Sequence, residues 1–158
     1  MMRKPLSVVI AMYNEEENIK PVTRELSVAL AHAGIPYEII CVSNGSTDGT
    51  EQELLAASEE NPCIHPIFLK EKGYGRAVIA GMRESSYEWV AVVVADGQTA
   101  PDDLLKAYET MAQTGADVIR IDGTEITIHE LAVSFKNGKG THNVDVKVAH
   151  IEKGSKIN

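Results

Sequence analysis

The sequence is poor in aromatic residues and cysteines, and it has no long apolar run. Aromatic residues make up 5% of the 158 residues, and Cys41 and Cys63 are the two cysteines. Two cysteines build no disulfide framework, so a reducing compartment, the cytoplasm, is expected. No stretch approaches the roughly 18 apolar residues of a membrane-spanning helix, which predicts a soluble protein without a transmembrane segment.

Basic residues are also in the minority. The chain has 15 Lys and Arg residues against 23 Asp and Glu residues, for a net charge of −8. This balance argues against a nucleic acid or an anionic membrane surface as the main partner, because both repel an acidic protein. The composition is otherwise that of a globular protein, and the length suits one domain with a real core.

Short apolar runs alternate with helix-forming stretches over the first 121 residues. Strands are predicted at Leu6–Met12, Tyr37–Val42, His65–Leu69, Trp89–Ala95 and Asp117–Ile121. Helices are predicted at Glu15–Ala33, Glu51–Ser58, Arg76–Ser85 and Pro101–Thr114. This alternation predicts an α/β fold with a mainly parallel sheet and helices on both faces. The nearly all-apolar run Trp89–Ala95 predicts a central strand that is covered on both faces.

The junction between the first strand and the first helix carries a helix-start signal. Asn14 is predicted to cap the helix, with Glu17 closing a capping box, and Gly34 is predicted to end it. Taken alone, this junction is equally explained by a capped amphipathic helix that follows a core strand.

Polar residues gather in the loops that follow the first four strands. These loops are 13–15, 43–48, 70–76 and 96–98. The carboxyl ends of parallel strands share one edge of the sheet, so the four loops are expected to converge on one crevice. Helix N-termini there offer free N–H groups to anions. The pattern predicts a nucleotide-type site without naming the ligand.

The pattern changes after Ile121. Glu125–Phe135 and Val144–Ile151 alternate apolar and polar residues, with Lys136–Gly140 between them. This predicts a half-exposed β-hairpin, an extension over 122–158 that is attached to a domain over 1–121. Because proteins cover or pair exposed strand edges, a homodimer joined through the hairpin is predicted.

Four segments, in this order and spacing, resemble the nucleotide-binding half of family 2 glycosyltransferases. They are LSVVIAMYNEEENI, YEIICVSNGSTDGT, GYGRAVIAGMR and WVAVVVADGQTAPDDL. The polyprenyl-phosphate branch, which includes enzymes similar to dolichol-phosphate mannose or glucose synthases, is the nearest in character. The resemblance implies a GT-A fold, a Rossmann-like α/β sandwich. It also implies a nucleoside-diphosphate sugar of the UDP or GDP type, and transfer of the sugar to an acceptor such as a polyprenyl phosphate.

The resemblance also implies which residues bind the nucleotide sugar. They are Ala11, Tyr13, Asn14, Glu15, Asn44, Lys72 and Asp96. Residues 11–15 occupy the family's Pro-x-Tyr-Asn-Glu motif without its proline, and Tyr13 and Glu15 match the residues that line the base pocket. Asn44 stands where the family has a base-reading aspartate, and Ser43 replaces the aspartate before it. Lys72 stands where the family's Asn-Arg-Gly-x-Gly motif has arginine, and a cation there can pair with the diphosphate or the base.

Interpretations that involve no ligand stay open for several residues of these loops. Tyr13 is also explained as a core aromatic residue, Lys72 as a solvated surface lysine, and Asp48 as the N-cap of the second helix.

The family's metal motif is incomplete. The family has Asp-x-Asp, often followed by x-Gln, whereas residues 94–98 read Val-Ala-Asp-Gly-Gln, so Val94 replaces the first aspartate. The resemblance implies Asp96 and Gln98 as ligands of Mg²⁺ or Mn²⁺, together with the phosphates of the nucleotide. Hard cations usually take several carboxylate and phosphate oxygens, so a weak site is expected. The alternative for Asp96 and Gly97 is a plain turn.

No catalytic residue is assigned, because the half that carries the family's acceptor platform has no counterpart after residue 119. The main interpretation is a glycosyltransferase; a phosphate acceptor is already ionised and would need no general base. The alternative is a non-catalytic nucleotide-sugar-binding module, degenerate or truncated, with an interaction hairpin. A third interpretation is an α/β domain whose loops are merely turns.

Overall fold

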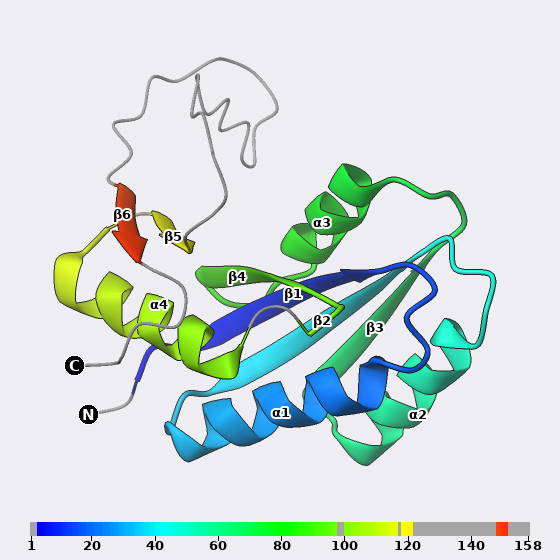
Figure 1. Ribbon diagram of the computed structural model, residues 1–158, viewed down its shortest axis with the longest axis horizontal. Coiled ribbons are helices and arrows are strands. Elements are labelled where there is room, and N and C mark those ends of the chain that lie inside the picture. Colours follow the sequence, from blue (N-terminus) through cyan, green and yellow to red (C-terminus); the bar gives the residue numbers. More distant parts are fainter. Residues whose placement is uncertain (1–2, 98–99, 117, 122–147, 152–158) are drawn as a thin grey trace. The chain divides into compact units, whose positions relative to one another are not determined.

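The computed structural model describes residues 3–97, 100–116, 118–121 and 148–151 (Figure 1). The chain divides into two compact units, Met1–Leu104 and Leu105–Asn158. The predicted division after residue 121 stays a prediction.

The first unit contains a four-stranded sheet in which every pairing is parallel, in the order β3-β2-β1-β4. The strands are β1 (Leu6–Met12), β2 (Tyr37–Asn44), β3 (Ile64–Leu69) and β4 (Trp89–Val94). The helices that connect them are α1 (Ile19–His32), α2 (Thr50–Glu60) and α3 (Tyr74–Arg83). In Figure 1, α1 and α2 lie on one face of the sheet and α3 lies on the other. The predicted α/β fold with a parallel sheet and helices on both faces is confirmed.

The core is centred on β1 and β2, the two inner strands. Val8, Val9 and Ile10 are fully buried, as is Val42 on the neighbouring strand. Helix α3 lies close to this sheet because Gly81 has no side chain: a Cβ at that position would be 2.4 Å from Cγ1 of Val9. This close packing holds α3 against β1 and β2, and the helix begins directly after the loop that follows β3.

The prediction that Trp89–Ala95 forms a central strand covered on both faces is wrong for the described residues. Strand β4 pairs with β1 alone and lies at the edge of the sheet. Val92 and Val94 are 45% and 39% exposed. A continuous apolar run indicates a strand, but it carries no information about how many neighbours that strand has.

Helix α1 begins four residues later than predicted. Residues 16–18 form a turn, and Asn18 is the N-cap residue, without a capping hydrogen bond from its side chain. The predicted capping box of Asn14 and Glu17 is therefore wrong. The C-terminal prediction is confirmed, because Gly34 takes a left-handed conformation with φ of 70° after the last turn.

Helix α4 (Pro101–Thr114) begins at the predicted proline. In the second unit, β5 (Val118–Ile121) pairs in parallel with β6 (Val148–Ile151). The first strand and the turn of the predicted hairpin lie outside the described residues. In the described part of the chain, no helix has the length and apolar character needed to cross a membrane.

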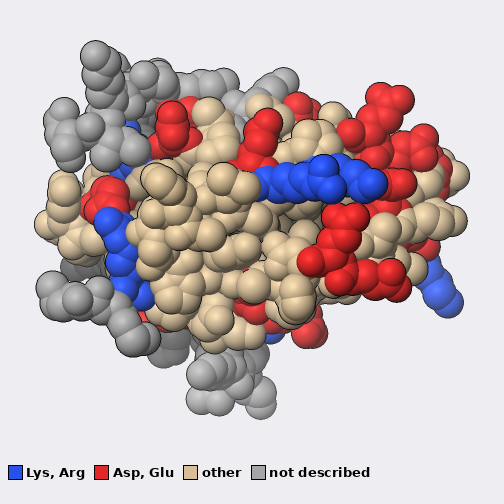
Figure 2. All heavy atoms as spheres, turned by 90° about the horizontal axis from the view of Figure 1, so that it is seen from below, with Lys and Arg blue, Asp and Glu red and all other residues tan. Residues whose placement is uncertain are grey.

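One face of the molecule is shown in Figure 2. Acidic side chains lie at several places on this face and gather toward its right-hand end. Among the residues coloured there, the Lys and Arg side chains form no continuous patch.

Candidate functional site

The register of the sheet brings the loops after β1, β2 and β4 to one edge. Met12 at the end of β1 lies opposite Ser43 of β2, and Ala11 lies opposite Val94 of β4. Strand β3 ends beside β2, with Leu69 opposite Asn44. The four predicted loops therefore begin at neighbouring positions, at the end of a parallel sheet where α/β proteins bind ligands.

Asn14 ties the loop after β1 to the loop after β2. Its Oδ1 accepts hydrogen bonds from the backbone N–H groups of Thr47 (2.8 Å) and Asp48 (3.3 Å), and its Nδ2 donates to Thr47 Oγ1 (3.2 Å). Its backbone has a φ of 51°, a conformation that asparagine tolerates better than most residues. The side chain of Asn14, which was predicted to bind nucleotide, thus uses its amide oxygen and nitrogen to position the loop after β2.

The two glutamates after Asn14 reinforce this connection. The backbone N–H of Glu15 donates to Thr50 Oγ1 (3.0 Å), while its carboxylate accepts from Asn18 Nδ2 (2.6 Å). The carboxylate of Glu16 accepts from the backbone N–H of Gly49 (2.9 Å). These contacts fix the turn between β1 and α1 against the N-terminus of α2.

Asp48 lies just before α2, but the N-cap residue is Gly49, so the alternative of Asp48 as the N-cap of the second helix is wrong. Its Oδ1 accepts hydrogen bonds from both the hydroxyl and the backbone N–H of Thr50. Desolvation acts to raise the pKa of Asp48, but these hydrogen bonds outweigh it and hold the pKa below its usual value. Asp48 is therefore an ionised, structural carboxylate at neutral pH.

Asn44 connects β2 to the glycine-bearing loop. It is 4% exposed, and its Oδ1 accepts a hydrogen bond from the backbone N–H of Gly73 (2.7 Å). The next residue, Gly45, has a φ of 69°, and a Cβ there would be 3.0 Å from the backbone nitrogen of Lys72. The carbonyl that was expected to read a base therefore already has a protein partner, and its role as a base reader stays a prediction.

Tyr13 and Lys72 are two predicted site residues that lie on the surface of this edge and contact each other. Tyr13 is 37% exposed, which excludes the alternative of a core aromatic residue. The Lys72 Nζ atom lies 3.9 Å from the centroid of the Tyr13 ring, a cation–π contact. The structure thus brings together two residues that are 59 positions apart in the sequence.

The remaining predicted residues lie along β1 and β4. Ala11 is half-buried and packs against the core beneath α3, so its side chain serves packing. Asp96 is exposed just beyond the end of β4. Gln98, the second predicted metal ligand, lies outside the described residues. Among the residues described, no three His, Cys, Asp or Glu side chains form a group that could hold a metal ion.

The described side chains could coordinate a divalent cation only together with a bound nucleotide. Asp96 supplies one carboxylate, whereas Mg²⁺ takes six oxygen ligands and keeps several waters or phosphates among them. Phosphate oxygens of a nucleotide would therefore have to complete the coordination.

Sequence reasoning missed the hydroxyl groups that hold the loops, Ser46, Thr47 and Thr50. Ser46 Oγ accepts a hydrogen bond from the backbone N–H of Asn14 (3.2 Å). The signal was present in the Ser-Thr-Asp-Gly-Thr run, which is dense in residues that bond to nearby backbone. The partners on the β1 loop could not be identified, because they depend on the register between two strands.

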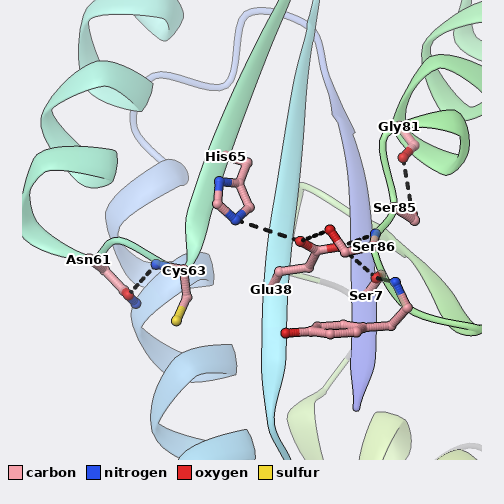
Figure 3. A network of polar contacts seen from close by, with 9 residues as sticks. Ser7, Glu38, Asn61, Cys63, His65, Gly81, Ser85 and Ser86 are labelled. Carbon is pink, nitrogen blue, oxygen red and sulfur yellow. Dashed lines mark hydrogen bonds and ion pairs between the residues drawn. The ribbon is translucent and has the colours of Figure 1, made fainter.

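A second polar cluster lies at the opposite, amino-terminal end of the strands. Figure 3 shows the buried carboxylate of Glu38 between Ser7, Ser86 and His65. It accepts hydrogen bonds from Ser7 Oγ (2.7 Å), Ser86 N (2.6 Å) and Ser86 Oγ (3.1 Å), and His65 Nε2 lies 3.6 Å away. The backbone N–H of Tyr87 donates to Ser7 Oγ (3.3 Å).

This cluster differs from a serine–histidine–acid relay. In such a relay the imidazole lies between the hydroxyl and the carboxylate. Here the carboxylate of Glu38 lies between the histidine and the hydroxyl groups of Ser7 and Ser86. The arrangement activates no nucleophile; it ties the segment between α3 and β4 to β1 and β2.

The cysteines add no reactive group to either cluster. Cys41 and Cys63 are free thiols, and Cys41 is buried in β2. Burial raises the pKa of the Cys41 thiol to about 12, so it stays protonated in the core.

Comparison with known proteins identifies relatives of this chain. Residues 7–130 match the family described as glycosyl transferase family 2. An undecaprenyl-phosphate 4-deoxy-4-formamido-L-arabinose transferase from Pseudomonas paraeruginosa is 34% identical over 116 residues, which are 72% of this chain and 34% of the relative. The protein of the same name from Pectobacterium carotovorum is 36% identical over 119 residues, 73% of this chain and 36% of the relative. The chain thus spans about a third of the length of these curated relatives.

Solved structures share the fold. S. aureus TarS 1-349 in complex with UDP has a TM-score of 0.59 and 23% identity, covering 88% of this chain and 38% of that one. The mannosyltransferase PcManGT from Pyrobaculum calidifontis, in complex with GDP-Man and Mn²⁺, has a TM-score of 0.52 and 24% identity, covering 60% of this chain and 28% of that one. These likenesses confirm the predicted GT-A fold.

Proposed function

The chain belongs to glycosyl transferase family 2, and from this membership we propose that it binds a nucleoside-diphosphate sugar at the carboxyl edge of its sheet. The sugar is then transferred to an acceptor. The observation that carries the proposal is the joining of three loops into one platform: Asn14 holds the loop after β2, and Asn44 holds the loop after β3. A platform fixed in this way presents Tyr13 and Lys72 to one ligand, and Asp96 follows β4, which ends at the same edge of the sheet.

Each of these three side chains has a distinct role in the proposal. The exposed ring of Tyr13 offers a flat apolar face for a nucleotide base. Lys72 supplies a positive charge on a flexible stem, which suits a diphosphate. Asp96, exposed beyond the end of β4, would supply a carboxylate for the cation that accompanies the diphosphate. The hydrogen bonds between the loops hold the spacing of Tyr13 and Lys72, and a fixed spacing of this kind positions a substrate for transfer.

A divalent cation, Mg²⁺ or Mn²⁺, is part of the proposal. Asp96 would be its described protein ligand, Gln98 is the second predicted one, and phosphate oxygens would supply others. When bound, such a cation stabilises the negative charge of a leaving diphosphate. That the related PcManGT structure contains Mn²⁺ supports this part of the proposal.

The proposed acceptor is a polyprenyl phosphate, a choice supported by the names of the undecaprenyl-phosphate transferases. A phosphate acceptor is a nucleophile that is already ionised at neutral pH. Transfer to it needs orientation and charge stabilisation more than a general base. This is consistent with a site for which no catalytic carboxylate has been assigned. The proposal also places the chain in the cytoplasm, supported by its free thiols.

One observation favours a second candidate, a module that binds the nucleotide sugar without turnover. Val94 is an exposed valine two residues before Asp96, at the position where the family motif has its first aspartate. The site therefore has one carboxylate fewer than the motif provides for the cation.

A paired experiment tests the proposal and separates the two candidates. Calorimetry with UDP, GDP, dTDP and CDP, each with Mn²⁺ and with chelator, measures binding. Release of the diphosphate from the corresponding nucleotide sugars, with a short polyprenyl phosphate as acceptor, measures turnover. Binding with acceptor-dependent release supports the transferase, and binding alone supports the module. If none of the four nucleotides binds, both candidates are wrong.

A further inference from the structure

The lysine of the glycine-bearing loop covers the aromatic ring of the first loop. The 3.9 Å from the Lys72 ammonium to the centroid of the Tyr13 ring is well inside the range of about 6 Å over which a cation is attracted to a ring face. The proposed function assigns this ring to a nucleotide base. In the described conformation, the ammonium therefore occupies a face of the ring that a base would need.

The backbone beneath Lys72 is fixed, so only the side chain has to move. Gly73 N–H donates to Asn44 Oδ1 (2.7 Å), and Gly45 N–H donates to the carbonyl oxygen of Leu69 (3.0 Å). A Cβ on Gly45 would lie 3.0 Å from the backbone nitrogen of Lys72. The end of β2 thus supports the loop on either side of the lysine. Four rotatable bonds then allow the ammonium to swing without disturbing this support.

The neighbouring cations of the loop are placed differently. Arg76 pairs with Glu71, with Nη1 2.9 Å from Oε2. Lys70 is exposed two residues before Lys72. Lys72 is therefore the cation of this loop that contacts the proposed base site, and Lys70 provides a matched control of the same charge and segment.

We propose that Lys72 exchanges partners when a nucleoside diphosphate binds: the ammonium leaves the ring face of Tyr13 and pairs with the diphosphate. This inference rests on the proposed nucleotide site. A diphosphate offers the ammonium charge-assisted hydrogen bonds, which are stronger than an exposed contact with a ring. A nucleoside without phosphates offers no such replacement. Lys72 thus acts as a specificity-determining residue that hinders nucleosides and favours nucleoside diphosphates.

Calorimetry with uridine and UDP, repeated with guanosine and GDP, tests this exchange on the full chain. Lys72→Met removes the charge and keeps an unbranched side chain, and Lys70→Met is the matched control. We expect Lys72→Met to bind the nucleoside about two- to fivefold more tightly, because the ring face is cleared of its cation. We expect it to bind the diphosphate about tenfold more weakly, because a charge-assisted contact is lost. Lys70→Met should change each affinity less than about twofold.

The opposite signs of the two effects are the signature of the exchange. If Lys72→Met weakens both ligands equally, or changes neither, the proposal is wrong. A wild-type protein that binds no diphosphate instead refutes the proposed function, so the two failures are distinguishable.

A spectroscopic measurement tests the contact even where nucleoside binding is too weak to compare. In protein with ¹³C-labelled lysine, the ε-methylene protons of Lys72 should be shifted upfield by the Tyr13 ring, and the Lys72→Met spectrum identifies the signal. UDP should return this signal to the position of a solvated lysine. An unshifted signal in the free protein, or a shifted signal that saturating UDP leaves in place, overturns the proposal.

Discussion

The buried carboxylate of Glu38 makes the strongest prediction about stability. It is 6% exposed and accepts hydrogen bonds from Ser7 Oγ, Ser86 N and Ser86 Oγ. We expect Glu38→Leu, which fills a similar volume without polar atoms, to leave the hydroxyl of Ser7 and the backbone N–H of Ser86 without their acceptor. Glu38→Gln keeps one oxygen in the position that serves these two donors.

The contacts set the size of each effect. Leaving a buried donor unpaired costs about 1–3 kcal/mol, and two donors are affected, but removing the carboxylate also relieves the desolvation of a buried charge. The net loss for Glu38→Leu should be about 2–4 kcal/mol of unfolding free energy. Glu38→Gln exchanges charge-assisted bonds for neutral ones and should cost about 1 kcal/mol.

Urea unfolding followed by circular dichroism measures both losses. Glu88→Leu is the control, because its side chain is 85% exposed and its contact with Lys4 is 3.9 Å long, so its effect should stay within about 0.5 kcal/mol. Nucleotide affinity should be unchanged in all three variants, since Glu38 lies at the amino-terminal end of the strands. A Glu38→Leu protein as stable as wild type would mean that the network does not hold the segment after α3. The structural role assigned to Glu38 would then be wrong.

Two further predictions concern the candidate site. Asn14→Ala loses the hydrogen bonds to residues 47 and 48 and places alanine at a φ of 51°. It should lower the free energy of unfolding by about 1–3 kcal/mol and weaken nucleotide binding. Asn14→Gly has no φ penalty, so it should lose less stability, while its nucleotide affinity should fall by the same factor. Equal stability losses in calorimetric melts would contradict this account of the turn. Val94→Asp should strengthen nucleotide binding by about 1–3 kcal/mol with Mn²⁺ and not with chelator, because a second carboxylate repels Asp96 unless a cation lies between them. If the variant and the wild-type protein have equal affinities under both conditions, residue 94 does not face the ion.

The order of elements in the first unit could be predicted because it depends on local signals. Apolar runs, glycine and proline positions identified β1 as Leu6–Met12, the start of α4 at Pro101 and the left-handed stop at Gly34. The start of α1 was predicted wrongly because a capping signal is local, whereas the actual partners of Asn14 are 33 and 34 positions away along the chain. The long-range bonds compete successfully with the cap.

The candidate site was predicted in outline for a similar reason. Parallel strands share an edge, so the convergence of the loops follows from topology alone. Which residues hold the loops and which face the ligand does not follow from topology, because it depends on the hydrogen-bond partners of individual atoms. Asn14 and Asn44 hold the loops together, whereas Tyr13 and Lys72 face outward. The edge position of β4 could not be predicted either, since an apolar run indicates a strand without identifying its neighbours, and Val92 and Val94 are exposed in spite of it.

The most direct test of the central claim is the affinity of UDP and GDP for wild-type protein and for Asp96→Ala, measured by calorimetry with Mn²⁺ and with chelator. We expect the wild-type protein to bind at least one of the two nucleotides more tightly with Mn²⁺ than with chelator. The variant should lose this metal-dependent gain and retain the metal-independent part, because Tyr13 and Lys72 are intact. If Asp96→Ala binds as tightly as wild type with Mn²⁺ present, or if the wild-type protein binds neither nucleotide, the nucleotide site does not lie at the carboxyl edge of this sheet.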